Sequence, residues 1–197
     1  MSKLDYLDAL LQENRGFIKT SDATYACVSR PYFGEYVRER GLERVAHGVY
    51  MSMDAWDDGM YVIQVRYPEA VFSHETALYL HNLAEREPEP YAVTLKTGTN
   101  STGLTKDGIK VYKVKAELFE EGIIEAKSPT GHTLRAYNAE RTICDLVRSR
   151  RNIEIQELQA AIKGYVRLKE KNIPQLMRYA KLFSVEKIIR PYLEVLL

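Results

Sequence analysis

The sequence has too few cysteines for a disulfide framework and no apolar run that could span a membrane. Cys27 and Cys144 are the only cysteines in 197 residues, so we expect both to be small core residues rather than redox or metal groups. No apolar run approaches the roughly 18 residues that a membrane span needs, and residues 1–15 lack the basic and then apolar layout of a secretory signal. These absences predict a soluble, cytoplasmic protein that does not associate with membranes.

Glycine and proline are also scarce, at 11 and 7 residues, which excludes low-complexity and collagen-like chains. The hydrophobic share of 45% and the charged share of 28% are typical of globular proteins. At roughly 150 residues per domain, the length allows one large or two small domains.

The net charge of +1 hides an asymmetry along the chain. Residues 1–92 carry nine Lys and Arg against 15 Asp and Glu, whereas residues 93–197 carry 19 against 12. A basic half is compatible with a phosphate-bearing partner, although solvated helix faces give similar counts.

The first fifty residues predict a winged helix-turn-helix. Leucines at helical spacing indicate a helix within 3–14, and the polar run 20–22 offers capping oxygens to a short helix ending near residue 26. Pro31 favours the start of a third helix over 31–40. The alternation over 42–50 around a glycine-containing turn is typical of a two-stranded hairpin.

In such a module the third helix enters the major groove of DNA with its N-terminal side chains leading. Ser29, Arg30 and Tyr32 stand at that leading end, where a guanidinium can make a bidentate contact with guanine and hydroxyls can reach phosphates or base edges. Gly34 costs this helix about 1 kcal/mol relative to alanine, so close packing or close approach to DNA would have to offset it. Further contacts that position the protein on DNA are expected from Lys19, Thr20, Arg38, Arg44 and His47.

Two other interpretations of this segment stay open. Arg38, Arg40 and Arg44 would pair with Glu35, Glu39 and Glu43 on a solvated face if the segment did not bind DNA. Small winged folds also serve as protein-interaction modules, and the first fifty residues carry seven charges of each sign.

The rest of the chain predicts a mixed α/β domain that ends in helices. Strands are expected over 60–65, 91–96, 109–116, 122–127 and 133–137, and a helix capped by Ser73 over 73–83. Asn138 should cap a helix to residue 148, and further helices are expected over 155–171, 174–183 and 184–197. The predicted class is therefore α+β, with a DNA-binding domain over 1–55 and an α/β domain over 56–197.

Several polar residues in this second part have a structural explanation. His74 and His81 lie seven residues apart, about 10.5 Å along a helix, which is too far for one metal ion; we expect packed or hydrogen-bonded histidines. Arg141 and Asp145 are spaced to pair on one helix face. The cations at 148, 150 and 151 suit a helix C-terminus, and this interpretation competes with phosphate binding.

Catalytic motifs are largely missing. Mg²⁺-dependent nucleases carry one acidic residue followed later by an acid-x-lysine motif, and Asp107, Glu125 and Lys127 loosely match this pattern. Asp107, however, lies in a Lys-Asp-Gly turn, and turn formation explains this residue without catalysis. The chain lacks G-x-S-x-G, H-E-x-x-H and paired C-x-x-C motifs. We expect no enzyme, no catalytic residues, no metal and no cofactor, with a Mg²⁺-dependent nuclease as an alternative.

Three blocks of the sequence, 40–50 (RGLERVAHGVY), 73–83 (SHETALYLHNL) and 140–146 (ERTICDL), resemble the AbiEi family of abortive-infection antitoxins. Their order and spacing agree over nearly the whole chain. The family often has glycine at the position of Cys27, so we expect the turn of the helix-turn-helix to be formed in a different way here.

The resemblance implies a two-domain antitoxin of a type IV toxin–antitoxin system. Its winged domain would bind inverted repeats in its own promoter. Since the sequence has no heptad seam, we expect a monomer in solution that pairs cooperatively on DNA. Its second domain would oppose a nucleotidyltransferase-like toxin without a stable complex; a module that inhibits its partner by direct contact is the alternative. We expect the basic half to add phosphate contacts through Arg148, Arg150, Arg151, Lys163 and Arg167.

Overall fold

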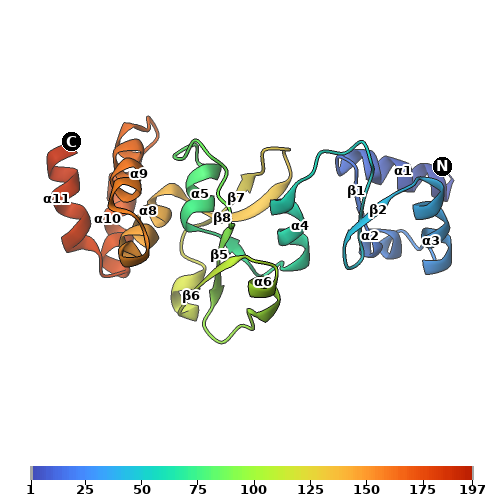
Figure 1. The fold of residues 1–197 in the computed structure, drawn as a ribbon, viewed down its shortest axis with the longest axis horizontal. Coiled ribbons are helices and arrows are strands. Elements are labelled where there is room, and N and C mark those ends of the chain that lie inside the picture. Colours follow the sequence, from blue (N-terminus) through green and yellow to red (C-terminus); the bar gives the residue numbers. More distant parts are fainter. Residues whose placement is uncertain (1, 197) are drawn as a thin grey trace. The chain divides into compact units, whose positions relative to one another are not determined.

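The protein is an α+β chain that divides into two compact units (Figure 1). The computed structural model describes residues 2–196. Unit 1 contains the residues up to Pro68 together with Ser128–His132, and unit 2 contains Glu69–Lys127 and the residues from Thr133 onward. The boundary expected after residue 55 therefore differs from this division, because residues 56–68 and a distant five-residue loop belong to unit 1.

Unit 1 combines short helices with a three-stranded antiparallel sheet in the order β1-β3-β2. The central strand β3 pairs with β1 through Ile18 opposite Tyr50, and its register with β2 shifts between Arg44 and Ala46. The strand β1 was not expected, because a three-residue segment is too short to show alternation. In chain order the elements are α1 (Lys3–Glu13), β1 (Phe17–Lys19), α2 (Thr20–Tyr25), α3 (Arg30–Glu39), β2 (Glu43–Ala46), β3 (Val49–Met51) and α4 (Gly59–Arg66).

The core of unit 1 lies among its first three helices and its sheet. Leu7 of α1, Ala23 of α2 and Phe33 of α3 are buried in one cluster with Ile18 of β1. The ring of Phe33 meets that of Tyr50 edge-on at 5.5 Å. Ser2 and Asp5 form a reciprocal capping box at the start of α1. The helices expected over 3–14, 20–26 and 31–40 and the hairpin over 42–50 are confirmed within one or two residues.

Cys27 is exposed, so the expectation that it is a core residue is wrong. It has φ of +55° in the turn between α2 and α3, the left-handed region that glycine adopts most easily. The turn is therefore made with a backbone conformation that glycine would favour. Cys144 is buried, as expected.

The strand expected over 60–65 is wrong, because this segment forms helix α4. The Asp58 carboxylate accepts a hydrogen bond from the Tyr61 N–H at 2.9 Å and caps the helix. Since most residues from Met60 to Val65 are apolar, the segment has no period that separates a strand from a helix.

Unit 2 contains a five-stranded mixed sheet in the order β6-β5-β4-β8-β7. Strands β5 and β6 run parallel, as do β4 and β8, and the other pairs are antiparallel. The elements that form and flank the sheet are β4 (Val71–Phe72), α5 (His74–Leu80), β5 (Ala92–Lys96), α6 (Thr102–Lys106), β6 (Lys110–Val114), α7 (Ala116–Phe119), β7 (Ile123–Lys127) and β8 (Thr133–Tyr137).

The C-terminal part of unit 2 is helical, as expected, and packs around α8 (Figure 1). Every residue of α8 from Glu140 to Val147 is buried. Asn138 caps this helix by accepting the Arg141 N–H at 2.9 Å, as predicted. The elements of this part are α8 (Ala139–Arg148), a 3₁₀ turn (Arg150–Asn152), α9 (Ile155–Arg167), α10 (Ile173–Leu182) and α11 (Glu186–Leu196).

Arg141 and Asp145 form the expected pair, with Nε to Oδ2 at 2.9 Å, but the pair is buried rather than exposed on a helix surface. Arg141 also donates to the carbonyls of Leu118 and Glu121. Its guanidinium lies 3.8 Å from the centre of the Phe183 ring. Burial raises the pKa of Asp145, although the charge of Arg141 acts in the opposite direction.

The two histidines of the 73–83 segment are hydrogen-bonded, as expected. His74 contacts the hydroxyls of Ser73 and Ser149 at 3.0 Å, and burial together with the charge of Lys110 lowers its pKa. His81 contacts the Tyr137 carbonyl at 2.7 Å. Ser73 precedes α5 but its side chain does not cap the helix, because its hydroxyl instead accepts from Thr94.

Candidate nucleic-acid interface

Helix α3 exposes a stripe of two arginines with a glycine between them. Arg30, Gly34 and Arg38 follow one another at four-residue spacing and are all exposed, so they lie on one side of the helix. The opposite side carries Phe33 and Tyr36, which are buried. The stripe is accessible to a ligand, and Pro31, Glu35 and Glu39 of the same helix are exposed as well.

Gly34 has no close neighbour. A Cβ atom built at this position would meet no other atom within 4 Å, so close packing does not explain a glycine here. The side chain of Arg38 lies along the helix, with Nε 3.4 Å from the Gly34 carbonyl oxygen.

The leading end of α3 presents Ser29, Arg30 and Tyr32. Ser29 occupies the cap position without a side-chain cap bond, and Pro31 lies in the first turn. The Lys3 amine is 5.9 Å from the centre of the Tyr32 ring. Ser29 and Arg30 are exposed and Tyr32 is half-buried.

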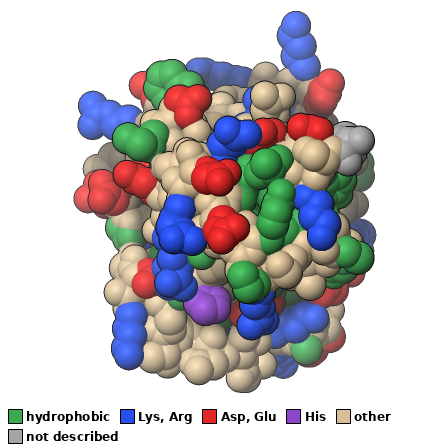
Figure 2. Space-filling model, turned by 90° about the vertical axis from the view of Figure 1, so that its right-hand side faces the viewer, with side chains coloured by type: hydrophobic (Ala, Val, Ile, Leu, Met, Phe, Trp, Pro, Cys, Tyr) green, Lys and Arg blue, Asp and Glu red, His purple; other side chains and the backbone are tan. Residues whose placement is uncertain are grey.

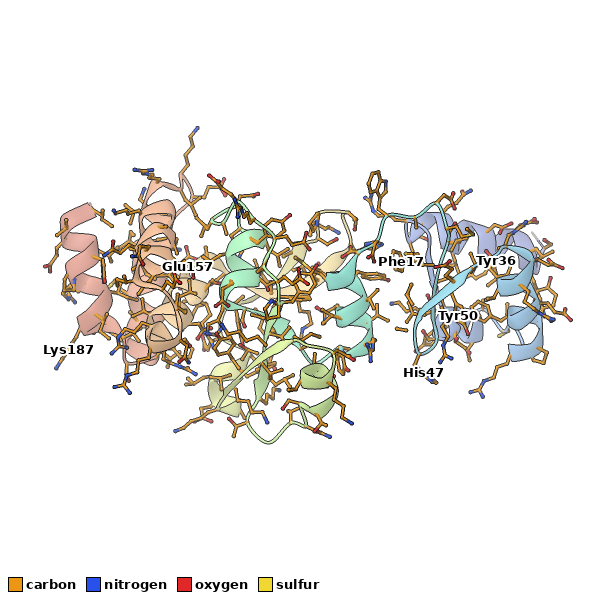
Figure 3. All side chains as sticks on the ribbon, in the orientation of Figure 1. Phe17, Tyr36, His47, Tyr50, Glu157 and Lys187 are labelled. Carbon is orange, nitrogen blue, oxygen red and sulfur yellow. The ribbon has the colours of Figure 1, made fainter. Side chains whose placement is uncertain are left out.

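The start of α2 and the β2–β3 hairpin are joined by hydrogen bonds. The backbone N–H and the hydroxyl of Thr20 both donate to the Gly48 carbonyl, at 2.8 and 3.3 Å. Arg44 contacts His47 Nδ1 at 2.9 Å and the Ala46 carbonyl at 3.3 Å. His47 lies at the tip of the hairpin (Figure 3). The structure therefore groups Thr20, Arg44 and His47 around one turn.

Lys19 precedes α2 in strand β1. Its amine lies 5.7 Å from the centre of the Tyr61 ring, a distance that suits a cation–π contact. Lys19 is thus held toward α4, and it is half-buried.

On the face of the molecule that Figure 2 shows, basic and acidic side chains are mixed rather than gathered into one basic patch. In Figure 2, blue Lys and Arg side chains lie on both sides of a purple histidine, and red Asp and Glu lie among them. Arg40 pairs with Asp8 of α1 through two hydrogen bonds, and those bonds lower the pKa of Asp8.

The alternative in which these arginines pair with neighbouring glutamates is wrong for Arg40, whose partner is on another helix. Within residues 2–196, neither Arg38 nor Arg44 forms an ion pair with a carboxylate. Both guanidinium groups therefore keep donors available.

The basic residues expected to assist from the second half lie in unit 2 and are exposed. Arg148 and Arg150 donate to backbone carbonyls, of Lys113 at 3.4 Å and of Val147 at 3.1 Å. The Arg150 bond agrees with the helix-end interpretation, because Val147 lies in the last turn of α8, whereas the acceptor of Arg148 is on strand β6. The other three are Arg151 in the 3₁₀ turn and Lys163 and Arg167 on α9.

The nuclease-like residues occupy separate elements. Asp107 follows the last turn of α6, whereas Glu125 and Lys127 are on β7, where Lys127 donates to the Thr133 hydroxyl at 2.6 Å. Among residues 2–196 there is no group of three or more His, Cys, Asp or Glu side chains that could hold a metal ion.

The loop Ser128–His132 brings a buried polar cluster into unit 1 that no sequence pattern predicts. Asp58 Oδ2 accepts from Ser128 at 2.6 Å and from His132 Nδ1 at 2.7 Å, and Thr130 donates to the same oxygen. Burial acts to raise the pKa of Asp58, but these hydrogen bonds outweigh it and lower the pKa. Asp58 and Ser128 are 70 residues apart, so no local pattern links them.

The imidazole of His132 completes this cluster. It stacks on the Tyr61 ring with centres 4.0 Å apart, and its Nε2 lies 3.2 Å from the Asn14 carbonyl oxygen. The cluster thus ties the start of α4 and the end of α1 to the 128–132 loop.

Comparisons with known proteins show a fold likeness. No protein-family model matches the chain, and no curated protein matches it. Among solved structures it is similar to the RV2827C protein from Mycobacterium tuberculosis, with a TM-score of 0.59 and 11% identity over 97% of this chain and 79% of that one. At this identity the likeness supports the mixed α and β fold alone. Within residues 2–196, no helix has the length and apolar character to cross a membrane.

Proposed function

We propose that the protein is a DNA-binding transcriptional repressor whose unit 1 is a winged helix-turn-helix. The order α1-β1-α2-α3-β2-β3 supports this proposal, since α2 and α3 would form the helix-turn-helix and the β2–β3 hairpin the wing. In this arrangement α3 enters the major groove and the hairpin contacts the backbone or the minor groove.

The observation that carries the proposal is the exposed Arg30–Gly34–Arg38 stripe on α3. Arg30 at the leading end would read guanine through two parallel hydrogen bonds. Gly34 leaves room for a phosphate or a base edge to approach the helix backbone, and Arg38 would hold a phosphate. Ser29 and Tyr32 add hydroxyl donors at the same end.

The remaining contacts would position the protein on the duplex. Thr20 and Lys19 stand at the start of α2, and Arg44 and His47 in the hairpin. Contacts of this kind go to phosphates and carry little sequence information.

The resemblance to AbiEi antitoxins extends the proposal to the biological role. The protein would repress its own toxin–antitoxin operon from the cytoplasm by binding inverted repeats in the promoter. It would act as a monomer that pairs cooperatively on the repeats. It would also neutralise a nucleotidyltransferase-like toxin without forming a stable complex.

The test is a gel-shift titration on the DNA upstream of the gene, against unrelated competitor DNA. Specific binding in two shifted species is expected, and Arg30→Ala should weaken it by about 1–3 kcal/mol. Arg30→Lys is the matched variant, because it keeps the charge but loses the bidentate geometry. A wild-type protein without preference over the competitor would contradict the proposal.

A protein-interaction module is the second candidate function. Tyr25, Met53 and Trp56 in unit 1 are 89%, 77% and 82% exposed, and large apolar side chains at a surface favour contacts with another protein. Stable co-purification with the toxin, together with no specific DNA binding, would favour this candidate.

A further inference from the structure

Unit 2 contains a cavity of about 770 Å³ with an apolar floor. Leu78 of α5, Leu146 of α8 and Ala161 of α9 line it and are buried. The half-buried side chains of Leu83 and Ile153 add to the apolar surface. A volume of this size is typical of small-molecule sites.

The polar lining of the cavity is strongly acidic. Six glutamates face only two cations, so the lining carries a net negative charge. Glu75 pairs with Lys110, and Glu87 accepts a hydrogen bond from Tyr91. The other four glutamates make no side-chain hydrogen bond or ion pair within residues 2–196. Glu157 extends from α9 (Figure 3). The glutamates are Glu75, Glu85, Glu87, Glu89, Glu154 and Glu157, and the cations are Arg86 and Lys110.

One carboxylate oxygen at the cavity lacks a partner although it is buried. Glu75 Oε1 accepts from the Lys110 amine at 2.8 Å, but Glu75 Oε2 is buried and has no hydrogen-bond partner among the described residues. Buried acceptors are nearly always satisfied. The Glu75 side chain as a whole is 27% exposed and lines the cavity, so a ligand cation can approach this carboxylate there.

These features select one class of ligand. An anion is disfavoured by the excess of carboxylates. A metal ion is disfavoured because residues 2–196 contain no group of three ligating side chains at metal-binding distance. An organic cation with an aliphatic body fits both the acidic mouth and the apolar floor, since each methylene gains by leaving water.

We propose that this cavity binds an aliphatic polyamine, with one ammonium group at Glu75 and another between Glu154 and Glu157. The methylene chain lies on the floor formed by Leu78, Leu146 and Ala161. This proposal is independent of DNA binding by unit 1.

The test is isothermal titration calorimetry of the full-length protein with spermidine at constant ionic strength. The wild type should give saturable one-site binding. Glu154→Gln combined with Glu157→Gln should weaken it about tenfold, because two of the nearest opposing charges are removed. Ala160→Arg should abolish it, since a guanidinium placed at this exposed lining position fills the mouth.

The matched control combines Glu170→Gln with Glu194→Gln, which removes two exposed carboxylates outside the cavity lining. This control should bind spermidine as the wild type does. The proposal is overturned if the wild type shows no saturable binding, or if the control pair weakens binding as much as the cavity pair. Equal melting temperatures of all variants will exclude a loss of fold as the cause.

Discussion

At the scale of one residue, the role proposed for Gly34 separates the stability of α3 from DNA recognition. Because nothing lies near its missing Cβ, Gly34→Ala should raise the free energy of unfolding by about 0.5–1 kcal/mol through better helix propensity. The same methyl group would obstruct the close approach of DNA to α3, so affinity for the promoter should fall. Urea unfolding and gel shifts measure the two effects.

Gly164 in α9 is the matched control for this prediction. Its added Cβ would lie 3.4 Å from a Leu83 methyl group, an ordinary contact distance, so Gly164→Ala should leave DNA binding unchanged. Undiminished DNA affinity of Gly34→Ala would show that α3 does not approach DNA at this point.

Asp58 gives unit 1 a stability that depends on pH. Burial acts to raise its carboxyl pKa, but hydrogen bonds from Ser128, Thr130 and the Tyr61 N–H outweigh burial and lower the pKa from 3.8. The carboxylate therefore stabilises the fold above pH 3.8, and this contribution is lost as the pH falls through the lower folded-state pKa. Asp58→Asn should cost about 1–3 kcal/mol at neutral pH.

The check is urea unfolding of the wild type and Asp58→Asn from about pH 7 to about pH 2.5. The difference between the two proteins should persist down to about pH 4 and then shrink. A difference that is constant over the whole range would mean that the charge of Asp58 adds nothing.

At the scale of elements, α8 depends on its buried ion pair. Arg141→Ala would leave the Asp145 carboxylate buried and the carbonyls of Leu118 and Glu121 without their donor. It should lower the free energy of unfolding by about 3–5 kcal/mol. The measurement is chemical denaturation followed by circular dichroism.

Replacing both charges is the control. Arg141→Met with Asp145→Leu removes the unpaired carboxylate, so the double variant should be more stable than Arg141→Ala. If the double variant is the less stable one, the ion pair contributes more than its desolvation costs.

The elements that the sequence predicts well are those with strong local signals. The strand expected over 133–137 is β8 with the same bounds, and the helix after Asn138 is α8, because alternation and a capping side chain act within a few residues. The prediction fails at 60–65, where an apolar run without a clear period is decided by the cap from Asp58. It also fails at Cys27, whose left-handed turn carries no glycine.

The candidate sites differ in how far the sequence could predict them. The exposed face of α3 follows from helical spacing alone. The Asp58 cluster and the acidic cavity join residues that are far apart in the chain, such as Glu75 and Glu157. Only the tertiary fold brings such residues together, so local patterns carry no signal for them.

At the scale of the whole molecule, the proposed DNA-binding function predicts that the basic residues of unit 2 affect how salt weakens DNA binding. Replacing the five with alanine should reduce the slope of log K against log salt by about 0.9 for each phosphate contact that is lost, without changing sequence preference. The measurement is a gel-shift series across salt concentrations. The five are Arg148, Arg150, Arg151, Lys163 and Arg167.

A control variant replaces Lys169, Lys181 and Lys187, three other exposed cations of unit 2. If the slope of log K against log salt falls by the same amount per removed charge in both variants, the effect is a general one of net charge. An unchanged slope in the fivefold variant would restrict DNA contacts to unit 1.

The 128–132 loop also limits how the protein can be dissected into fragments. A truncation after Pro68 would keep Asp58 but remove Ser128, Thr130 and His132, which donate to its carboxylate. The isolated fragment would then keep only the Tyr61 N–H of the four donors to this carboxylate and fold less stably. Loss of DNA binding by such a fragment would therefore report on its folding and not on α3.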